Sequence, residues 1–272
     1  MALEQRNTLL RWSLQHKLGT ALYLSGDVRA AEREFAAVTA AAPDAVPDEA
    51  TAKAHYSLGV IMMSRGRAPD AVPHLEEAVR YQPTYLEARL ALAEVLRRTG
   101  RVRESLPHYR SALAIAPATP QAQLGYAMGL IRLGLYRDAR DELTEAVAAA
   151  PDNRELAHVL ARLLAVAPDD EVRDGAAAMR LLDGLMKGTR TTELGETMAM
   201  ALAELGDYDG AASVQRSVLA VVRKGASPAA VRRVEENLHR YEQRQPCRTF
   251  WEDEEDTPFR DANAAPPIRR VP

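Results

Sequence analysis

Three stretches of the sequence superimpose without gaps: residues 58–75 read LGVIMMSRGRAPDAVPHL, residues 92–109 read LAEVLRRTGRVRESLPHY, and residues 126–143 read YAMGLIRLGLYRDARDEL. The second position of each stretch is a small residue, which we call its anchor, and the three anchors (59, 93 and 127) are 34 residues apart. An earlier stretch, LGTALYLSGDVRAAEREF at residues 18–35, has the same pattern. A fixed period of this length is typical of repeat proteins, in which each unit buries its apolar face against its neighbours.

The same residue types return at fixed distances from each anchor. The apolar spacing predicts two amphipathic helices per unit. A glycine seven residues after the anchor can end the first helix in the left-handed conformation, and a proline twenty-four residues after it stops the second. Two further prolines, Pro73 and Pro107, are expected in the first turn of a second helix, where they are tolerated. The recurring residues are Gly26, Gly66, Gly100 and Gly134, and Pro43, Pro83, Pro117 and Pro151.

This pattern resembles the tetratricopeptide repeat. The resemblance implies an all-α fold, a right-handed α-solenoid of about six helical hairpins that spans residues 1–226. The fifth and sixth units are degenerate and resemble terminal units of bacterial repeat proteins. Residues 227–245 are expected to form a capping helix with Ser227 as its N-cap, and residues 246–272 an extended acidic, Pro-rich tail. The units are expected near residues 12–45, 52–85, 86–119, 120–153, 154–191 and 192–225.

Composition narrows the function classes. The chain has 272 residues, a net charge of -3 and one cysteine, which excludes an internal disulfide. The charge balance gives no general case for nucleic acid, and the short apolar runs predict no integral membrane protein. The N-terminus lacks the pattern of a signal peptide. The simple expectation is therefore a cytoplasmic protein, with a periplasmic or extracellular location as the alternative if the chain is a mature or excised segment.

No catalytic motif is present, so we expect neither an enzyme nor a cofactor. His74 and His108 occupy equivalent repeat positions, which favours a repeat feature over a metal pair. Cys247 lies beside Arg248, but an inert thiol is the simpler interpretation. The sequence therefore predicts no metal site.

The resemblance places a binding surface on the first helix of each unit, at what we call the inner positions: three residues before the anchor, and one, four and five after it. Apolar side chains with arginines beside them suit a protein or peptide segment that has apolar anchors and acidic neighbours. An equally simple interpretation is that the arginines only solvate this face. Chaperone-binding relatives clamp a carboxylate with Lys and Asn where this chain has His16 and Thr20, so that function is not expected. The predicted binding residues are Tyr23, Tyr56, Met63, Arg97, Arg98, Met128, Ile131, Arg132 and Arg162.

The tail leaves two alternatives open. Its aromatic residues Phe250, Trp251 and Phe259 favour docking onto the repeats, whereas its composition also suits disorder. Its acidic run, residues 252–256, could occupy a basic surface of this chain or of another copy. The expected function is a non-enzymatic protein-interaction scaffold. The alternatives are an accessory subunit of a bacterial envelope or electron-transfer assembly, a docking subunit for a separate enzyme, and a homo-oligomer that self-associates through the tail.

Overall fold

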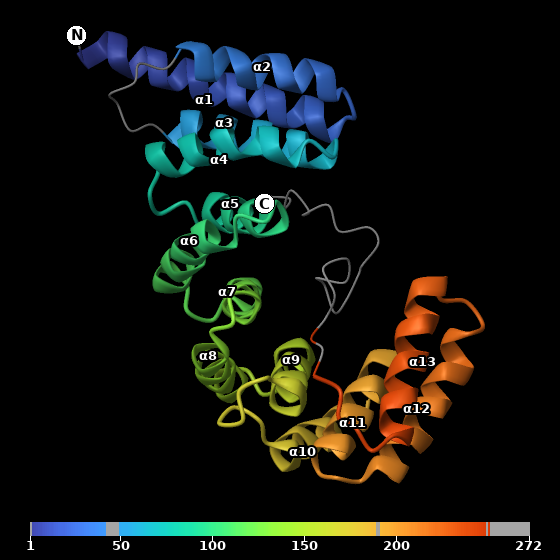
Figure 1. The fold of residues 1–272 in the computed structure, drawn as a ribbon. Coiled ribbons are helices and arrows are strands. Elements are labelled where there is room, and N and C mark those ends of the chain that lie inside the picture. The colour runs from blue at the N-terminus through green and yellow to red at the C-terminus, as the bar shows by residue number, and fades with distance from the viewer. Residues whose placement is uncertain (1, 42–48, 189–190, 249, 251–272) are drawn as a thin grey trace. The chain divides into compact units, whose positions relative to one another are not determined.

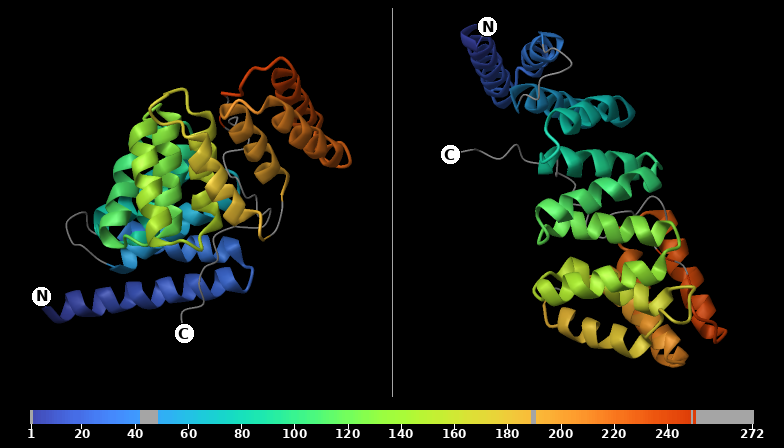
Figure 2. Two further views of the ribbon diagram at one scale, coloured as in Figure 1. Left: turned by 90° about the horizontal axis from the view of Figure 1, so that it is seen from below. Right: turned by 90° about the vertical axis from the view of Figure 1, so that its left-hand side faces the viewer.

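The computed structural model describes residues 2–41, 49–188, 191–248 and 250, without the side chains of residues 2–6. These residues form helices and no strands, arranged as six consecutive hairpins and a final single helix (Figure 1, Figure 2). The all-α repeat fold is therefore confirmed. The hairpins are α1 (Ala2–Leu24) with α2 (Val28–Ala41), α3 (Glu49–Ser64) with α4 (Ala68–Tyr81), α5 (Leu86–Arg98) with α6 (Val102–Ile115), α7 (Pro120–Arg132) with α8 (Tyr136–Ala149), α9 (Arg154–Val166) with α10 (Gly175–Leu185), and α11 (Thr192–Glu204) with α12 (Tyr208–Val222), followed by α13 (Pro228–Glu242).

The recurring glycines end the first helices as predicted. Gly66, for example, has a φ of 72°, and the next residue, Arg67, donates its backbone N–H to the carbonyl oxygen of Met62 at 2.9 Å. This six-to-one hydrogen bond satisfies a carbonyl that the end of the helix leaves without a partner. The same conformation occurs at Gly26, Gly100, Gly134 and Gly206.

The prediction for the two internal prolines was wrong. Pro73 is the sixth residue of α4 and Pro107 the sixth of α6, so both lie beyond the first turn. Each therefore removes a helical hydrogen bond to the residue four positions earlier. Both prolines are exposed. The carbonyl group that loses its partner can turn to water on that side of the helix, which is why the helices continue.

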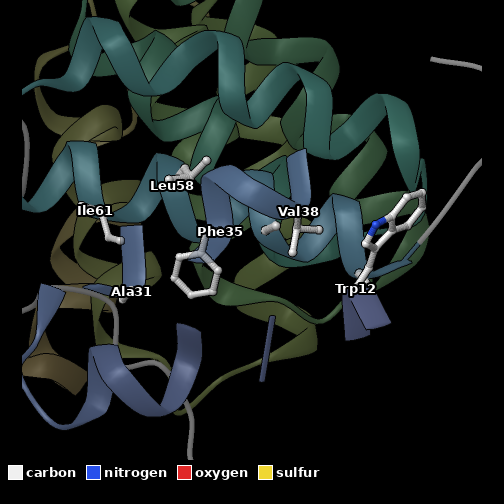
Figure 3. Packing of buried hydrophobic residues seen from close by; sticks show 8 residues of the cluster. Trp12, Ala31, Phe35, Val38, Leu58 and Ile61 are labelled. Carbon is white, nitrogen blue, oxygen red and sulfur yellow. The ribbon is translucent and has the colours of Figure 1, made fainter. Parts of the chain in front are cut away.

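The chain divides into two compact units, residues 1–129 and 130–272, which we call the first and second units; the sequence repeats themselves correspond to the hairpins. In the first, the helices pack around a core in which Phe35 of α2 lies between α1 and α3 (Figure 3). Small residues are required where these helices meet. A methyl group at Gly19 would lie 2.7 Å from the Phe35 ring, and one at Gly59 would lie 2.8 Å from Leu75. These short distances explain why the anchor positions hold small residues.

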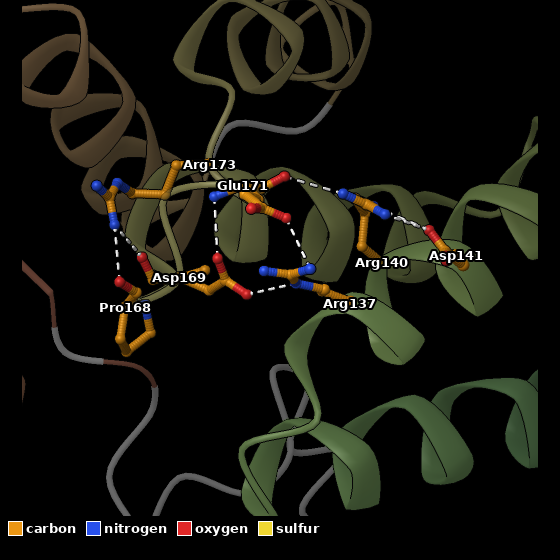
Figure 4. Close-up of polar contacts among 8 residues, drawn as sticks. Arg137, Arg140, Asp141, Pro168, Asp169, Glu171 and Arg173 are labelled. Atoms are coloured by element: carbon orange, nitrogen blue, oxygen red, sulfur yellow. Dashed lines mark hydrogen bonds and ion pairs between the residues drawn. The ribbon is translucent and has the colours of Figure 1, made fainter.

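In the second unit, the long loop between α9 and α10 is held by ion pairs (Figure 4). Arg137 of α8 pairs with Asp169 at 2.8 Å and with Glu171 at 2.7 Å. Arg173 donates to the carbonyl oxygen of Ala167 at 2.7 Å and pairs with Glu204 of α11 at 3.0 Å. This loop is therefore an ordered link between neighbouring hairpins.

The last helix begins as the sequence predicted. The Ser227 hydroxyl oxygen accepts a hydrogen bond from the backbone N–H of Ala230, and Pro228 is the first residue of α13. The helix packs on α12, where Gln215 donates to the carbonyl oxygen of Val234 at 3.1 Å. The chain thus adds one more helix after its sixth hairpin.

Candidate functional site

The inner positions of α1 and α3 present half-buried apolar side chains. Tyr23 packs against the core that surrounds Phe35, while Tyr56 and Met63 pack against the next core cluster along the chain. Partial burial fixes the orientation of these side chains and leaves part of each accessible. In this first unit, three predicted binding residues therefore have the character that an apolar contact surface needs.

Tyr85 joins this surface and was missed by the sequence analysis. It lies in the short loop before α5, and its ring centroid is 5.1 Å from that of Tyr56 in a tilted arrangement. Burial raises the pKa of both phenols, so both stay neutral. The only signal in the sequence was a large aromatic residue just after the recurring proline, a position outside the inner pattern.

Arg97 and Arg98 are adjacent in sequence but have different surroundings. Arg97 is 4% exposed and pairs with Glu94 at 3.0 Å. The same carboxylate accepts a hydrogen bond from the Tyr109 hydroxyl at 2.9 Å. Arg98 is exposed. Arg97 therefore supports the packing of α5 on α6, and Arg98 is the arginine of this pair that a partner can reach.

The predicted residues of α7 are divided in the same way. Met128, which belongs to the first unit, and Ile131, which belongs to the second, are each 6% exposed. Arg132 at the end of the helix is exposed. The two apolar residues thus contribute to packing, and Arg132 is the surface residue.

In the second unit, most inner positions of α9 and α11 are buried. His158, Arg162 and Glu196 are each at most 3% exposed. Glu196 pairs with Arg233 of α13 at 3.3 Å, so the C-terminal helix reaches over α11. Arg162 is therefore not at the open surface that the repeat pattern predicted.

His158 shows how polar groups are accommodated in this unit. Its Nε2 atom lies 2.9 Å from the Thr197 hydroxyl, which itself donates to the backbone carbonyl oxygen of Glu193. Burial and, next, the charge of Arg162 lower the pKa of His158 to about 4. The imidazole is neutral at physiological pH and acts as a structural hydrogen-bonding group.

The segment after α13 contacts the same unit. Cys247 is 1% exposed, and Arg248 pairs with Glu204 of α11 at 2.6 Å. Residues 246–248 are thus held against α11. The predictions for Trp251, Phe259 and the acidic run 252–256 lie outside the described residues.

The equivalent histidines His74 and His108 are not brought together. His74 instead pairs with His55 of α3, with 3.2 Å between their Nδ1 atoms. Burial and the neighbouring ring lower the pKa of His55 to about 4. Among residues 2–41, 49–188, 191–248 and 250, no three side chains of metal-binding type form a cluster. Across the same ranges, every helix is too short or too polar to span a bilayer.

The comparisons with known proteins agree with this architecture. Two sequence profiles described as tetratricopeptide repeat match the chain, one over residues 16–72 and 56–121 and the other over residues 96–163. The comparison with curated proteins gave no match.

Three solved structures illustrate the similarity in fold. The structure titled as a functional characterization of Pseudomonas aeruginosa pilF has a TM-score of 0.60 at 14% identity and covers 83% of this chain and 96% of its own. MamA from Desulfovibrio magneticus RS-1 has a TM-score of 0.57 at 18% identity, with 65% and 97% covered. YrrB, titled a TPR protein with an unusual peptide-binding site, has a TM-score of 0.54 at 16% identity, with 74% and 90% covered. At these identities, the likeness concerns the fold.

Proposed function

Because the chain belongs to the tetratricopeptide repeat family, a family of protein-interaction scaffolds, we propose that it is non-enzymatic and binds a peptide segment on the inner positions of its first unit. The segment has apolar anchor residues with carboxylates beside them. It is extended or helical and is held by side chains of α1, α3 and α5.

The observation that carries this proposal is the half-buried tyrosine pair Tyr56–Tyr85. Tyrosine offers a large, rigid contact area with only two side-chain torsions to fix, so binding costs little conformational entropy. Met63, on the same helix as Tyr56, adds an adaptable apolar contact. Arg98 at the end of α5 supplies an exposed cation that can pair with a carboxylate in a bidentate manner.

The burial of most inner positions of α9 and α11 favours a site in the first unit. Arg97 and Arg162 are buried, so they act through the packing of their own helices. Arg132 is exposed and remains a candidate contact of the second unit. YrrB, a TPR protein with an unusual peptide-binding site, provides a parallel among proteins of this fold.

The test is selection from a display library of random peptides with the full chain as bait. We expect enriched peptides to combine aromatic or aliphatic residues with Asp or Glu. Tyr56→Ser combined with Arg98→Glu should abolish capture, because it removes the aromatic contact and reverses the charge. Arg103→Glu, which changes an exposed arginine on α6 away from the inner positions, is the matched control and should leave capture intact.

Arg132→Glu, tested separately, reports on the second unit. Arg97→Glu is avoided, because a second carboxylate beside Glu94 in a buried setting would damage the fold. Enrichment of peptides without acidic residues, or equal capture by the double variant and the control, contradicts the proposal.

A further inference from the structure

The first helix of the chain is apolar on two opposite faces. Trp12 is 6% exposed and packs inward on the core of the first unit. On the other side, Leu10, Leu14 and Leu18 are 59%, 57% and 50% exposed. An apolar stripe on a helix of a globular protein normally packs against another element. Here, three leucines on successive turns form an open face, which we call the leucine face.

The repeat pattern identifies what normally covers this face. Leu14 and Leu18 lie five residues and one residue before the anchor Gly19. The same two positions in the next four repeats are at most 5% exposed. In the second repeat, the residues at these positions, Ala54 and Leu58, belong to one core cluster with Phe35 and Val38 of the preceding helix α2. The second helix of the preceding hairpin therefore buries these positions. The equivalent pairs are Ala54 and Leu58, Ala88 and Leu92, Ala122 and Tyr126, and Leu156 and Leu160.

The charges around the leucine face select among possible occupants. Arg11 and Lys17 are exposed beside it, and residues 7–24 contain no Asp or Glu. If two copies paired in antiparallel fashion about Leu14, Arg11 of each would face Lys17 of the other. Like charges placed opposite each other are destabilising. An acidic helix instead gains ion pairs with Arg11 and Lys17. A membrane surface would more often be met by interfacial aromatic residues, whereas Trp12 points into the core.

We propose that the leucine face of α1 binds an amphipathic helix of a partner protein, with carboxylates along its apolar stripe, in the place where the second helix of a preceding hairpin would lie. This contact is separate from the inner positions. It continues the stack of the first unit by one helix supplied in trans.

The chain itself provides a suitable probe. Helix α8 packs on α9, whose two equivalent positions are Leu156 and Leu160, so it already covers a pair of leucines. Its residues 136–149 carry four carboxylates and two arginines, a net charge of -2 (2 − 4). A fluorescent peptide of residues 134–151, cross-linked at exposed positions to keep it helical, is titrated with the full chain and followed by anisotropy.

The expected result is saturable binding that weakens at least about tenfold in Leu14→Glu combined with Leu18→Glu, because two buried leucines are lost and two carboxylates face an acidic helix. Both positions are exposed, and circular dichroism checks that the variant folds. The matched control is Leu205→Glu combined with Val221→Glu, two other apolar residues that are 52% and 55% exposed. This control protein should bind the peptide with unchanged affinity. A peptide that carries Leu143→Asp should no longer bind the wild-type chain.

Three results overturn the proposal. The first is absence of saturable peptide binding, or equal binding by both double variants. The second is concentration-dependent dimerisation in sedimentation equilibrium that Leu14→Glu with Leu18→Glu abolishes, which makes a second copy the occupant. The third is leucine-dependent binding to phosphatidylcholine–phosphatidylglycerol vesicles, which makes a membrane surface the occupant of the leucine face. The Tyr56→Ser, Arg98→Glu variant should bind the helix with unchanged affinity, so failure of the inner-position proposal is distinguishable from failure of this one.

Discussion

Replacing Gly125 by alanine tests how tightly consecutive hairpins approach each other. A methyl group at this position of α7 would lie 2.4 Å from two ring carbons of Tyr109 and 2.6 Å from its hydroxyl oxygen. Tyr109 is 1% exposed and is held by its hydrogen bond to Glu94, so moving the ring would break that bond and disturb the surrounding core. Either the tyrosine leaves its rotamer or α6 and α7 separate.

The sign of the effect follows from two opposing terms. Alanine favours the helical state over glycine by about 1 kcal/mol in a helix interior. Overpacking a fixed core costs about 1 to 3 kcal/mol, and a 2.4 Å contact with a buried ring belongs at the upper end. We therefore expect a net loss of about 1 to 2 kcal/mol in the free energy of unfolding.

Gly184→Ala is the matched control, because no atom outside the neighbouring backbone of α10 lies within 4 Å of the added methyl group. It should stabilise by up to about 1 kcal/mol, so the same substitution has opposite signs at two helical positions. Urea unfolding followed by circular dichroism measures both. Tyr109→Leu added to Gly125→Ala should recover part of the loss as a favourable coupling energy. A Gly125→Ala variant at least as stable as the wild type refutes the reasoning.

Two further predictions concern the second unit. His158 has a folded-state pKa of about 4 against an ordinary value of 6.5, so the unfolded chain takes up a proton first as the pH falls. The stability that the neutral imidazole contributes is present above pH 6.5 and is lost towards pH 4, by up to about 3 kcal/mol. His158→Gln should therefore flatten the pH dependence of the unfolding free energy between these two pH values. Arg173→Ala should cost about 1 to 3 kcal/mol and speed hydrogen exchange in residues 167–174, because it leaves buried partners unsatisfied. Arg137→Ala, which removes a side chain that is 56% exposed, should cost less than about 1 kcal/mol. Equal losses in the two arginine variants would contradict this view of the loop.

The sequence predicted the helices well because their punctuation is local. Gly66 and Gly100 end a helix through their own backbone conformation, which neighbouring residues do not need to impose. Pro73 shows the limit of this reasoning. The spacing gave its position relative to the helix start only within a few residues, whereas tolerance of a proline depends on which side of the helix meets water.

The binding residues were harder to predict because burial depends on distant segments. Arg97 and Arg98 are neighbours on one helix, and only the position of Glu94 and Tyr109 decides that the first is buried and the second exposed. Arg162 is 2% exposed, and Glu196 of α11, which is also buried, pairs with Arg233 of α13, far later in the chain. A repeat pattern assigns each residue to a face of its helix, and it does not show which element covers that face.

The same limit makes departures from the pattern informative. Leu14 and Leu18 have the residue type that their repeat positions require, yet they are exposed because the first hairpin has no neighbour among the described residues before it. Leu156 and Leu160, at the equivalent positions of α9, are buried by α8. Identical side chains at identical positions therefore differ by whether the neighbouring helix is present, and the free energy of burying them is still available at α1. At the other end of the chain, α13 covers its unit with a charged outer face, which leaves little apolar area to bind a further helix. In a repeat protein, an exposed residue at a position that the following four repeats bury is thus a stronger indication of a binding surface than an exposed leucine alone.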